Sequence, residues 1–93
     1  MELPVKYSTL SAYKRRKVRE AYIARQGGKC YYCGEPLDDL PSEFVMRLEI
    51  HPNRYPKGFF KTPVHLHHNH DTDLTIGAVH AGCNAVLWEY EGE

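Results

Sequence analysis

The sequence predicts a small α+β domain that a bound metal ion helps to hold together. Two pairs of metal-binding side chains share one spacing, Cys30-x-x-Cys33 and His80-x-x-Cys83. Five of the six histidines fall between residues 65 and 80, and a basic segment of helical character precedes the first cysteine pair. A chain of 93 residues is expected to form one domain, residues 1–93, whose hydrophobic core alone gives marginal stability.

Charge is divided unevenly along a chain whose formal net charge is zero. From Lys6 to Lys29 there are eight basic residues and one acid, and from Cys30 to Glu93 there are four and ten, which gives +7 and −6. The basic portion suits a polyanionic partner such as DNA. The alternative is a solvated helix face whose charge only keeps the domain soluble.

The number of cysteines and the hydropathy of the sequence indicate in which cellular compartment the protein is expected. Three cysteines do not close a disulfide framework, which favours a reducing environment. No apolar run is long enough to span a bilayer, and the N-terminus lacks the pattern of a signal peptide. We therefore expect a soluble protein of the cytoplasm.

The first 28 residues predict a basic lead-in helix. Ser8, Thr9 or Ser11 can cap its start, and Gly27-Gly28 supply a stop after about Gln26. On a helical wheel an apolar stripe is formed by Leu10, Tyr13, Val18, Ala21 and Ala24. The opposite side, which we expect to contact phosphates, carries Arg15, Arg16 and Arg19.

The paired spacings predict a structural zinc site with the ligands Cys30, Cys33, His80 and Cys83. Two thiolates separated by two residues can reach one tetrahedral ion from a tight turn. Four protein ligands leave no position for substrate, so the ion would close the region 30–83 into a loop. A redox Cys-x-x-Cys motif is the alternative, disfavoured by the lack of a strand–helix context and by the second pair.

The middle of the chain combines turn composition, one alternating segment and a basic loop. Residues 35–42 have the composition of a turn, and residues 43–50 alternate polar and apolar side chains, which predicts a half-buried strand. Residues 51–63 form a proline-broken loop in which aromatic residues are interleaved with Arg54, Lys57 and Lys61. This mixture suits contact with a nucleic-acid backbone and its bases. Alternatively, Phe59 and Phe60 only fill the small core.

The C-terminal third predicts a β-hairpin followed by a helix. Residues 64–70 and 74–79 have the pattern of two strands joined by a turn at 71–73, and a short helix is expected from Asn84 to about Tyr90. The first strand carries His65, His67, His68 and His70. Such a concentration of imidazole indicates a metal or acid–base site. The alternative is an incidental histidine-rich tract that binds metal adventitiously.

These motifs together resemble the HNH (ββα-metal) nucleases, most closely the phage endonuclease VII-like branch. The resemblance covers the lead-in helix, Gly28-Lys29-Cys30-Tyr31-Tyr32-Cys33, the histidine-rich strand and His80-Ala81-Gly82-Cys83-Asn84. The segment 43–63 lies outside it. The resemblance implies a ββα-metal motif over residues 64–90, and a phage origin would place the protein in the host cytoplasm.

The resemblance also implies a division of roles among the histidines. His67 and Asn84 would bind a catalytic divalent ion, and His68 would be the general base. His65 and His70 would contact substrate or protonate the leaving group. The endonuclease VII-like branch usually has Asp at the position of His67, whereas other HNH nucleases have His there. The alternative for His68 is a purely structural histidine.

The function expected from these features is metal-dependent hydrolysis of DNA, with Mg²⁺ or Mn²⁺ at the catalytic site and structural zinc beside it. A neutral imidazole can activate water near pH 7. Adjacent histidines on a regular strand project to opposite sides, so the pair would divide ion binding from proton transfer. The alternatives are a nuclease selective for branched DNA and a non-catalytic zinc module that binds nucleic acid. The protein is expected to act as a monomer or a homodimer.

Overall fold

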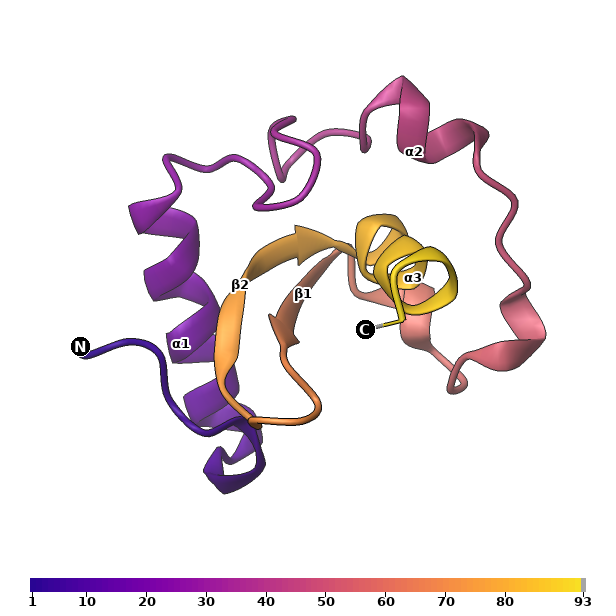
Figure 1. Cartoon of the computed structure of the whole chain (residues 1–93). Coiled ribbons are helices and arrows are strands. Elements are labelled where there is room, and N and C mark those ends of the chain that lie inside the picture. The colour runs from indigo at the N-terminus through magenta and orange to yellow at the C-terminus, as the bar shows by residue number, and fades with distance from the viewer. Residues whose placement is uncertain (93) are drawn as a thin grey trace.

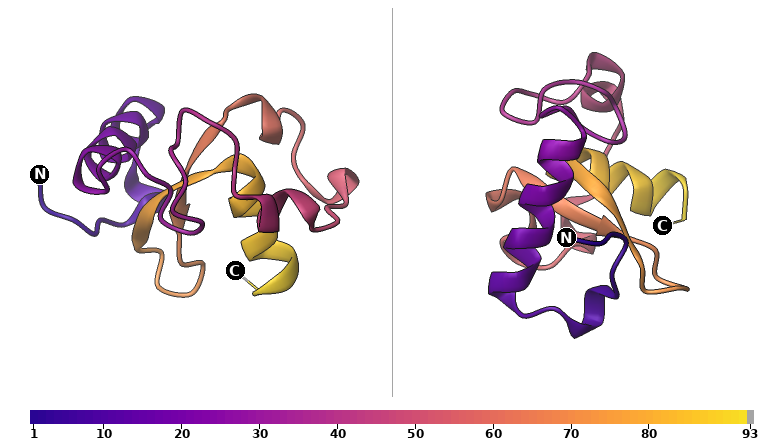
Figure 2. Two further views of the ribbon diagram at one scale, coloured as in Figure 1. Left: turned by 90° about the horizontal axis from the view of Figure 1, so that it is seen from above. Right: turned by 90° about the vertical axis from the view of Figure 1, so that its left-hand side faces the viewer.

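A β-hairpin between two helices forms the centre of the protein, as a computed structural model shows for residues 1–92. Strand β1 (Val64–His68) pairs antiparallel with β2 (Thr75–His80). Helix α1 (Ala12–Arg25) lies along the hairpin on one side, and α3 (Ala81–Tyr90) follows directly from β2 on the other (Figures 1 and 2). The predicted α+β class, hairpin and final helix are therefore confirmed.

Helix α1 begins and ends close to where the sequence predicts. The Ser11 hydroxyl accepts a hydrogen bond from the Lys14 backbone N–H (3.2 Å), and Gly27 has φ +65°, a conformation that favours glycine. The predicted apolar stripe is partly wrong. The buried residues of α1 are Val18, which packs in the apolar core, and Tyr22, whose hydroxyl reaches β2 and bonds to Thr75 Oγ1 (2.8 Å).

Tyr13 belonged to the predicted stripe but lies on the surface, with 62% of its area exposed. The charged groups of Arg16 and Lys17 lie over its ring, 5.8 and 5.5 Å from the centroid. The face of this aromatic ring therefore contacts the charged groups of neighbouring basic residues instead of entering the core.

The strand predicted over residues 43–50 is wrong, because this segment contains the short helix α2 (Glu43–Arg47). Ser42 caps it, its hydroxyl accepting from the Val45 N–H (3.4 Å), and a one-turn helix satisfies hydrogen bonds that an isolated strand would leave unpaired. Val45 is buried, whereas Phe44 and Met46 are exposed. The alternation of side chains over residues 43–50 therefore does not correspond to one buried and one exposed face of a strand.

The loop from α2 to β1 passes around the outer side of α3 and contains the 3-10 helices η2 (Pro52–Arg54) and η3 (Phe59–Lys61) (Figure 1). Tyr55 attaches it to α3. Its buried hydroxyl donates to the carbonyl of Ala85 (3.0 Å) and to the carboxylate of Glu89 (2.9 Å). Glu89 also accepts from the backbone N–H of His51 (2.8 Å). These hydrogen bonds hold the loop against α3.

The outer edge of β2 is bonded to the C-terminal end of α1. The Gln26 side chain accepts from the Ala78 N–H (2.9 Å) and donates to the Ala78 carbonyl (2.9 Å), as a neighbouring strand would. A Cβ at Gly77 would lie 2.9 Å from Gln26 Oε1 and 3.0 Å from Tyr31 Cβ. Glycine at this position therefore lets β2 approach both segments.

The core lies where the hairpin meets the two helices and the cysteine turn. Its buried residues include Val18, Leu66, Val79 and Val86, and the cysteines Cys30 and Cys83 belong to the same cluster. None of the helices within residues 1–92 combines the length and hydrophobicity that crossing a membrane would require.

Candidate functional site

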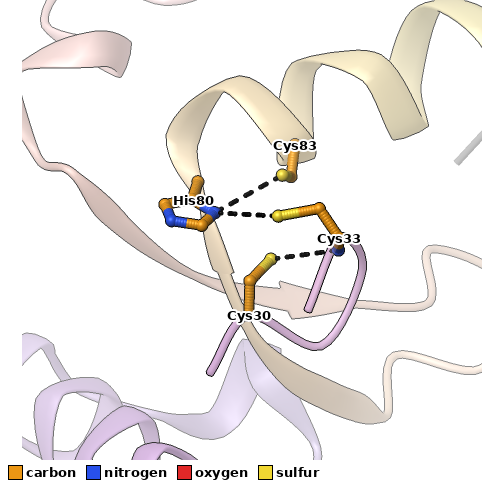
Figure 3. A group of neighbouring side chains, drawn as sticks. All are labelled: Cys30, Cys33, His80 and Cys83. Carbon is orange, nitrogen blue, oxygen red and sulfur yellow. Dashed lines mark hydrogen bonds between the residues drawn. The ribbon is translucent and has the colours of Figure 1, made fainter. Parts of the chain in front are cut away.

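Two centres lie side by side in the structure: a cluster of cysteines with one histidine, and a cavity lined by the other histidines of the hairpin. The first cluster consists of Cys30, Cys33, His80 and Cys83. Their ligand atoms all lie within 4.8 Å of one another (Figure 3). The predicted ligand set is therefore assembled in space, with residues from the turn after α1, the end of β2 and the first turn of α3.

The turn that carries the first two cysteines is shaped by backbone hydrogen bonds. The Cys30 N–H donates to the Glu35 carbonyl (2.8 Å), and the Gly34 N–H donates back to the Cys30 carbonyl (3.0 Å). Gly34 has φ +82°, which favours glycine at this position. The Tyr31 N–H donates to the Ala78 carbonyl (3.0 Å), which places the turn against β2.

One hydrogen bond determines which nitrogen of His80 faces the thiols. Its Nε2–H donates to the carbonyl of Pro36 (2.9 Å), so the lone pair is on Nδ1. Nδ1 lies 3.5 Å from Cys33 Sγ and 3.6 Å from Cys83 Sγ (Figure 3). A backbone carbonyl that orients the imidazole in this way is common at histidine metal ligands.

When no cation lies among the thiols, ionisation of one of them disfavours ionisation of its neighbours. A hydrogen bond from the Cys83 thiol is the main reason why the pKa of Cys30 lies below its usual value. The same bond, together with burial, raises the pKa of Cys83. A dication would allow all three thiols to ionise, and three thiolates with one imidazole form a donor set that suits structural zinc.

The second centre is a cavity of about 450 Å³ between α1, β1, α3 and the loop before β1. All five residues expected to be catalytic line it: His65, His67, His68, His70 and Asn84. Tyr7, Phe59 and Trp88 also line it. Sequence reasoning expected Phe59 either to contact nucleic acid or to fill the core, and gave Tyr7 and Trp88 no place in the site. For Tyr7 no motif or spacing could have indicated one.

Asn84 directly follows the ligand Cys83 and presents a buried oxygen without a hydrogen bond. Its Nδ2 donates to His65 Nδ1 (3.0 Å), while the His65 Nε2–H donates to the Phe59 carbonyl (2.8 Å). Among residues 1–92, Asn84 Oδ1 is the buried side-chain oxygen for which no hydrogen-bond partner is found. Such an atom is costly to bury unless a cation or another donor satisfies it.

His65 is thereby fixed as the residue that orients Asn84. Both of its ring nitrogens are engaged, one as donor and one as acceptor. Burial also lowers the pKa of His65, which favours the neutral ring that this arrangement needs. The geometry favours this orienting role over the substrate contact or proton transfer implied by the resemblance.

The pairing of β1 with β2 is irregular at His67 and His68. The pairing register shifts between them, so that His67 lies opposite Gly77 while His68 lies opposite Thr75. Ile76 is passed over, and both histidines line the same cavity. That the two imidazoles project to opposite sides of the strand stays a prediction.

His68 is half-buried between two aromatic rings. The Tyr7 ring stacks on it with centroids 3.8 Å apart, and the His70 ring stacks at 4.7 Å. Burial, followed by the effect of His70, lowers the pKa of His68. The neutral imidazole, which can accept a proton, is thus the favoured form.

The predicted DNA-contacting residues divide into two groups. Arg15 and Arg19 of α1 and Lys57 of the loop line the cavity. Arg16, Arg54 and Lys61 are not among its lining residues. Arg16 instead lies 3.8 Å from the Glu20 carboxylate on the exposed side of α1.

Searches with family models, among curated proteins and among solved structures give no match to this chain.

The cysteine–histidine cluster predicts about one zinc ion per chain that survives dialysis. Cys83→Ser should release the ion and unfold the domain, because the free energy of metal binding at such a site contributes directly to folding. Asn84→Ala, one residue further along α3, should retain both zinc and fold. Metal analysis and far-UV circular dichroism measure these outcomes, and folded protein without zinc would refute the assignment.

Proposed function

We propose that this protein is a metal-dependent endonuclease of the HNH type that hydrolyses phosphodiester bonds in DNA. His68 is the general base, and His67 and Asn84 hold a divalent ion such as Mg²⁺ or Mn²⁺. The observation that carries the proposal is the buried Asn84 Oδ1, which lacks a hydrogen bond and belongs to a residue lining the same cavity as His67 and His68.

The residues fit a divalent ion of this kind. An amide oxygen and an imidazole leave most coordination positions to water and phosphate, as Mg²⁺ prefers. The bound cation would offset the negative charge that develops on the phosphate and on the leaving oxygen. His65 supports this role of Asn84, because its bond to Nδ2 turns the amide so that Oδ1 is left for the ion.

The proposed hydrolysis needs one proton acceptor and one attacking water. His68 takes a proton from the water, whose oxygen attacks phosphorus as the P–O3′ bond breaks. The leaving 3′ oxygen takes a proton from solvent, so the products carry a 5′-phosphate and a 3′-hydroxyl. Arg15, Arg19 and Lys57 would bind neighbouring phosphates, since they line the cavity that holds these histidines.

A rival function is a non-catalytic zinc module that binds nucleic acid through the same cations. That function does not explain why the buried Asn84 Oδ1 lacks a hydrogen-bond partner in a cavity that also contains a neutral histidine. Incubation of supercoiled plasmid with zinc-loaded protein and Mg²⁺ or Mn²⁺ separates the two functions, because only the nuclease converts it to nicked or linear forms. Comparing the cleavage rates of branched and linear duplexes of equal length tests the alternative that the nuclease is selective for branched DNA.

His68→Ala should lower the cleavage rate by about 10²- to 10⁴-fold, the usual contribution of a positioned base. Zinc content, fold and DNA affinity should be preserved, because His68 is not a ligand of the cysteine–histidine cluster. His51→Ala is the matched control, since His51 is exposed and bonded to Glu89, and it should cleave as the parent does. Cleavage by the His68→Ala protein at the parental rate would assign the base elsewhere.

Asn84→Ala should raise the Mg²⁺ concentration needed for half-maximal cleavage by about 10-fold or more, because even groups that only support a metal ligand contribute that much to affinity. The measurement is a Mg²⁺ titration of the cleavage rate. Asn53→Ala, which removes an exposed amide outside the cavity, should leave the titration unchanged. Equal Mg²⁺ dependence in the Asn84→Ala and parental proteins would exclude Asn84 as a ligand.

Arg15→Ala and Arg19→Ala should each weaken DNA binding and flatten the slope of log affinity against log salt by up to about 0.9, the value for one lost phosphate contact on duplex DNA. Arg16→Ala removes the same charge from the same helix but outside the cavity, so its slope should stay close to that of the parent. Fluorescence anisotropy at several salt concentrations measures the slopes. If all three substitutions reduced the DNA affinity and the salt slope equally, DNA would be bound by a diffuse basic surface instead of at the cavity.

A further inference from the structure

We propose that Tyr7 is a positioning residue for His68, whose imidazole it holds by stacking flat on one face. The ring centroids lie 3.8 Å apart and the ring planes differ by 6°. The inference rests on the proposed function, in which His68 is the base. It adds to that function a residue at the far N-terminal end of the chain, separated from His68 by 60 positions in the sequence.

The imidazole of His68 is held from both sides. His70 stacks on it with centroids 4.7 Å apart and planes 13° apart. Two rings that are nearly parallel to a third at these distances would overlap if they shared one of its faces. Tyr7 and His70 therefore lie on opposite faces of His68, and tilting of the imidazole out of its plane is blocked in both directions.

Backbone hydrogen bonds to the start of β2 and to the turn before it hold Tyr7 in place. Its N–H donates to the Asp73 carbonyl (2.8 Å), and the Thr75 N–H donates to the Val5 carbonyl (2.9 Å). Lys6 and Leu74 form an antiparallel bridge between these bonds. Residues 5 and 6 thus lie beside the start of β2 in an isolated bridge, and the 3-10 helix η1 (Tyr7–Thr9) begins directly after them, with the Tyr7 ring on His68.

Side chains fix this N-terminal segment further. The Ser8 N–H donates to both carboxylate oxygens of Asp73, each at 3.2 Å. Arg15 donates from Nη1 to the Tyr7 hydroxyl at 3.4 Å, and its guanidinium lies 5.7 Å from the centroid of the Tyr7 ring. Tyr7 is therefore in contact with one of the cations proposed to bind phosphate and with the proposed base.

The stack has a direct consequence for proton transfer. A general base acts only when its nitrogen lies within hydrogen-bond distance of the attacking water. Misplacement by about 1 Å can lower a rate by about 10²-fold. A ring held on both faces keeps its nitrogens in one plane, so removal of the Tyr7 ring should affect the chemical step and leave DNA binding intact.

The test compares Tyr7→Leu with Tyr7→Phe in zinc-loaded full-length protein. Tyr7→Leu should lower the single-turnover cleavage rate at saturating DNA and Mg²⁺ by about 10- to 100-fold, as expected for a displaced catalytic group. The dissociation constant for DNA should change little. Tyr7→Phe retains the stacking ring and loses only the bond to Arg15, so it should restore most of the rate. If Tyr7→Leu does not fold, Tyr7→Met fills the space without a flat ring and takes its place.

A spectroscopic measurement separates this inference from the proposed function. The carbon-bound ring protons of His68 are shielded by the stacked Tyr7 ring, so their NMR signals should move downfield in Tyr7→Leu and stay in place in Tyr7→Phe. This shift does not depend on cleavage. Unchanged signals, or shifted signals with the parental cleavage rate, would overturn the positioning role, whereas a parent that cleaves no DNA would overturn the proposed nuclease function itself.

Discussion

The convergence of three thiols and one imidazole is the interaction on which the rest of the structure depends. Cys33 and His80 are separated by 46 intervening residues, which include α2, the basic loop and β1. Closing so long a loop is costly in conformational entropy, and a chain of this size has a small core to offset that cost. A metal ion bound by the four side chains would join the turn after α1 to the junction of β2 and α3.

The same junction links the metal centre to the histidine cavity. Cys83 and Asn84 are consecutive on α3, where successive side chains point about 100° apart around the axis. Cys83 therefore faces the thiol cluster while Asn84 lines the cavity. The orientation of α3 that brings Cys83 to the other thiols thus also brings Asn84 to His65. Loss of the ion would disturb the cavity even though none of the proposed catalytic residues is a ligand of this cluster.

Patterns that depend on local spacing were predictable from the sequence. The cluster of Cys30, Cys33, His80 and Cys83, the hairpin and the helix after it follow from short-range periodicity and paired spacing, and the structure contains all three. The strand expected at residues 43–50 was wrong, because a capping serine and the lack of a partner strand outweighed an alternating pattern. Tyr13 was assigned to the core for a similar reason, since a helical wheel does not show which neighbour the helix will meet.

The geometry around the histidines could not be predicted, because it arises from contacts between distant segments. His67 and His68 line one cavity, and the N-terminal segment, which is bridged to the residues at the start of β2, lays Tyr7 on His68. The basic residues show the same dependence on tertiary structure. Arg15 and Arg19 line the cavity from α1 and Lys57 lines it from the loop, so cations approach the histidines from two separate segments. A phosphate backbone bound by both segments would pass over the histidines, which is the path that cleavage by His68 requires.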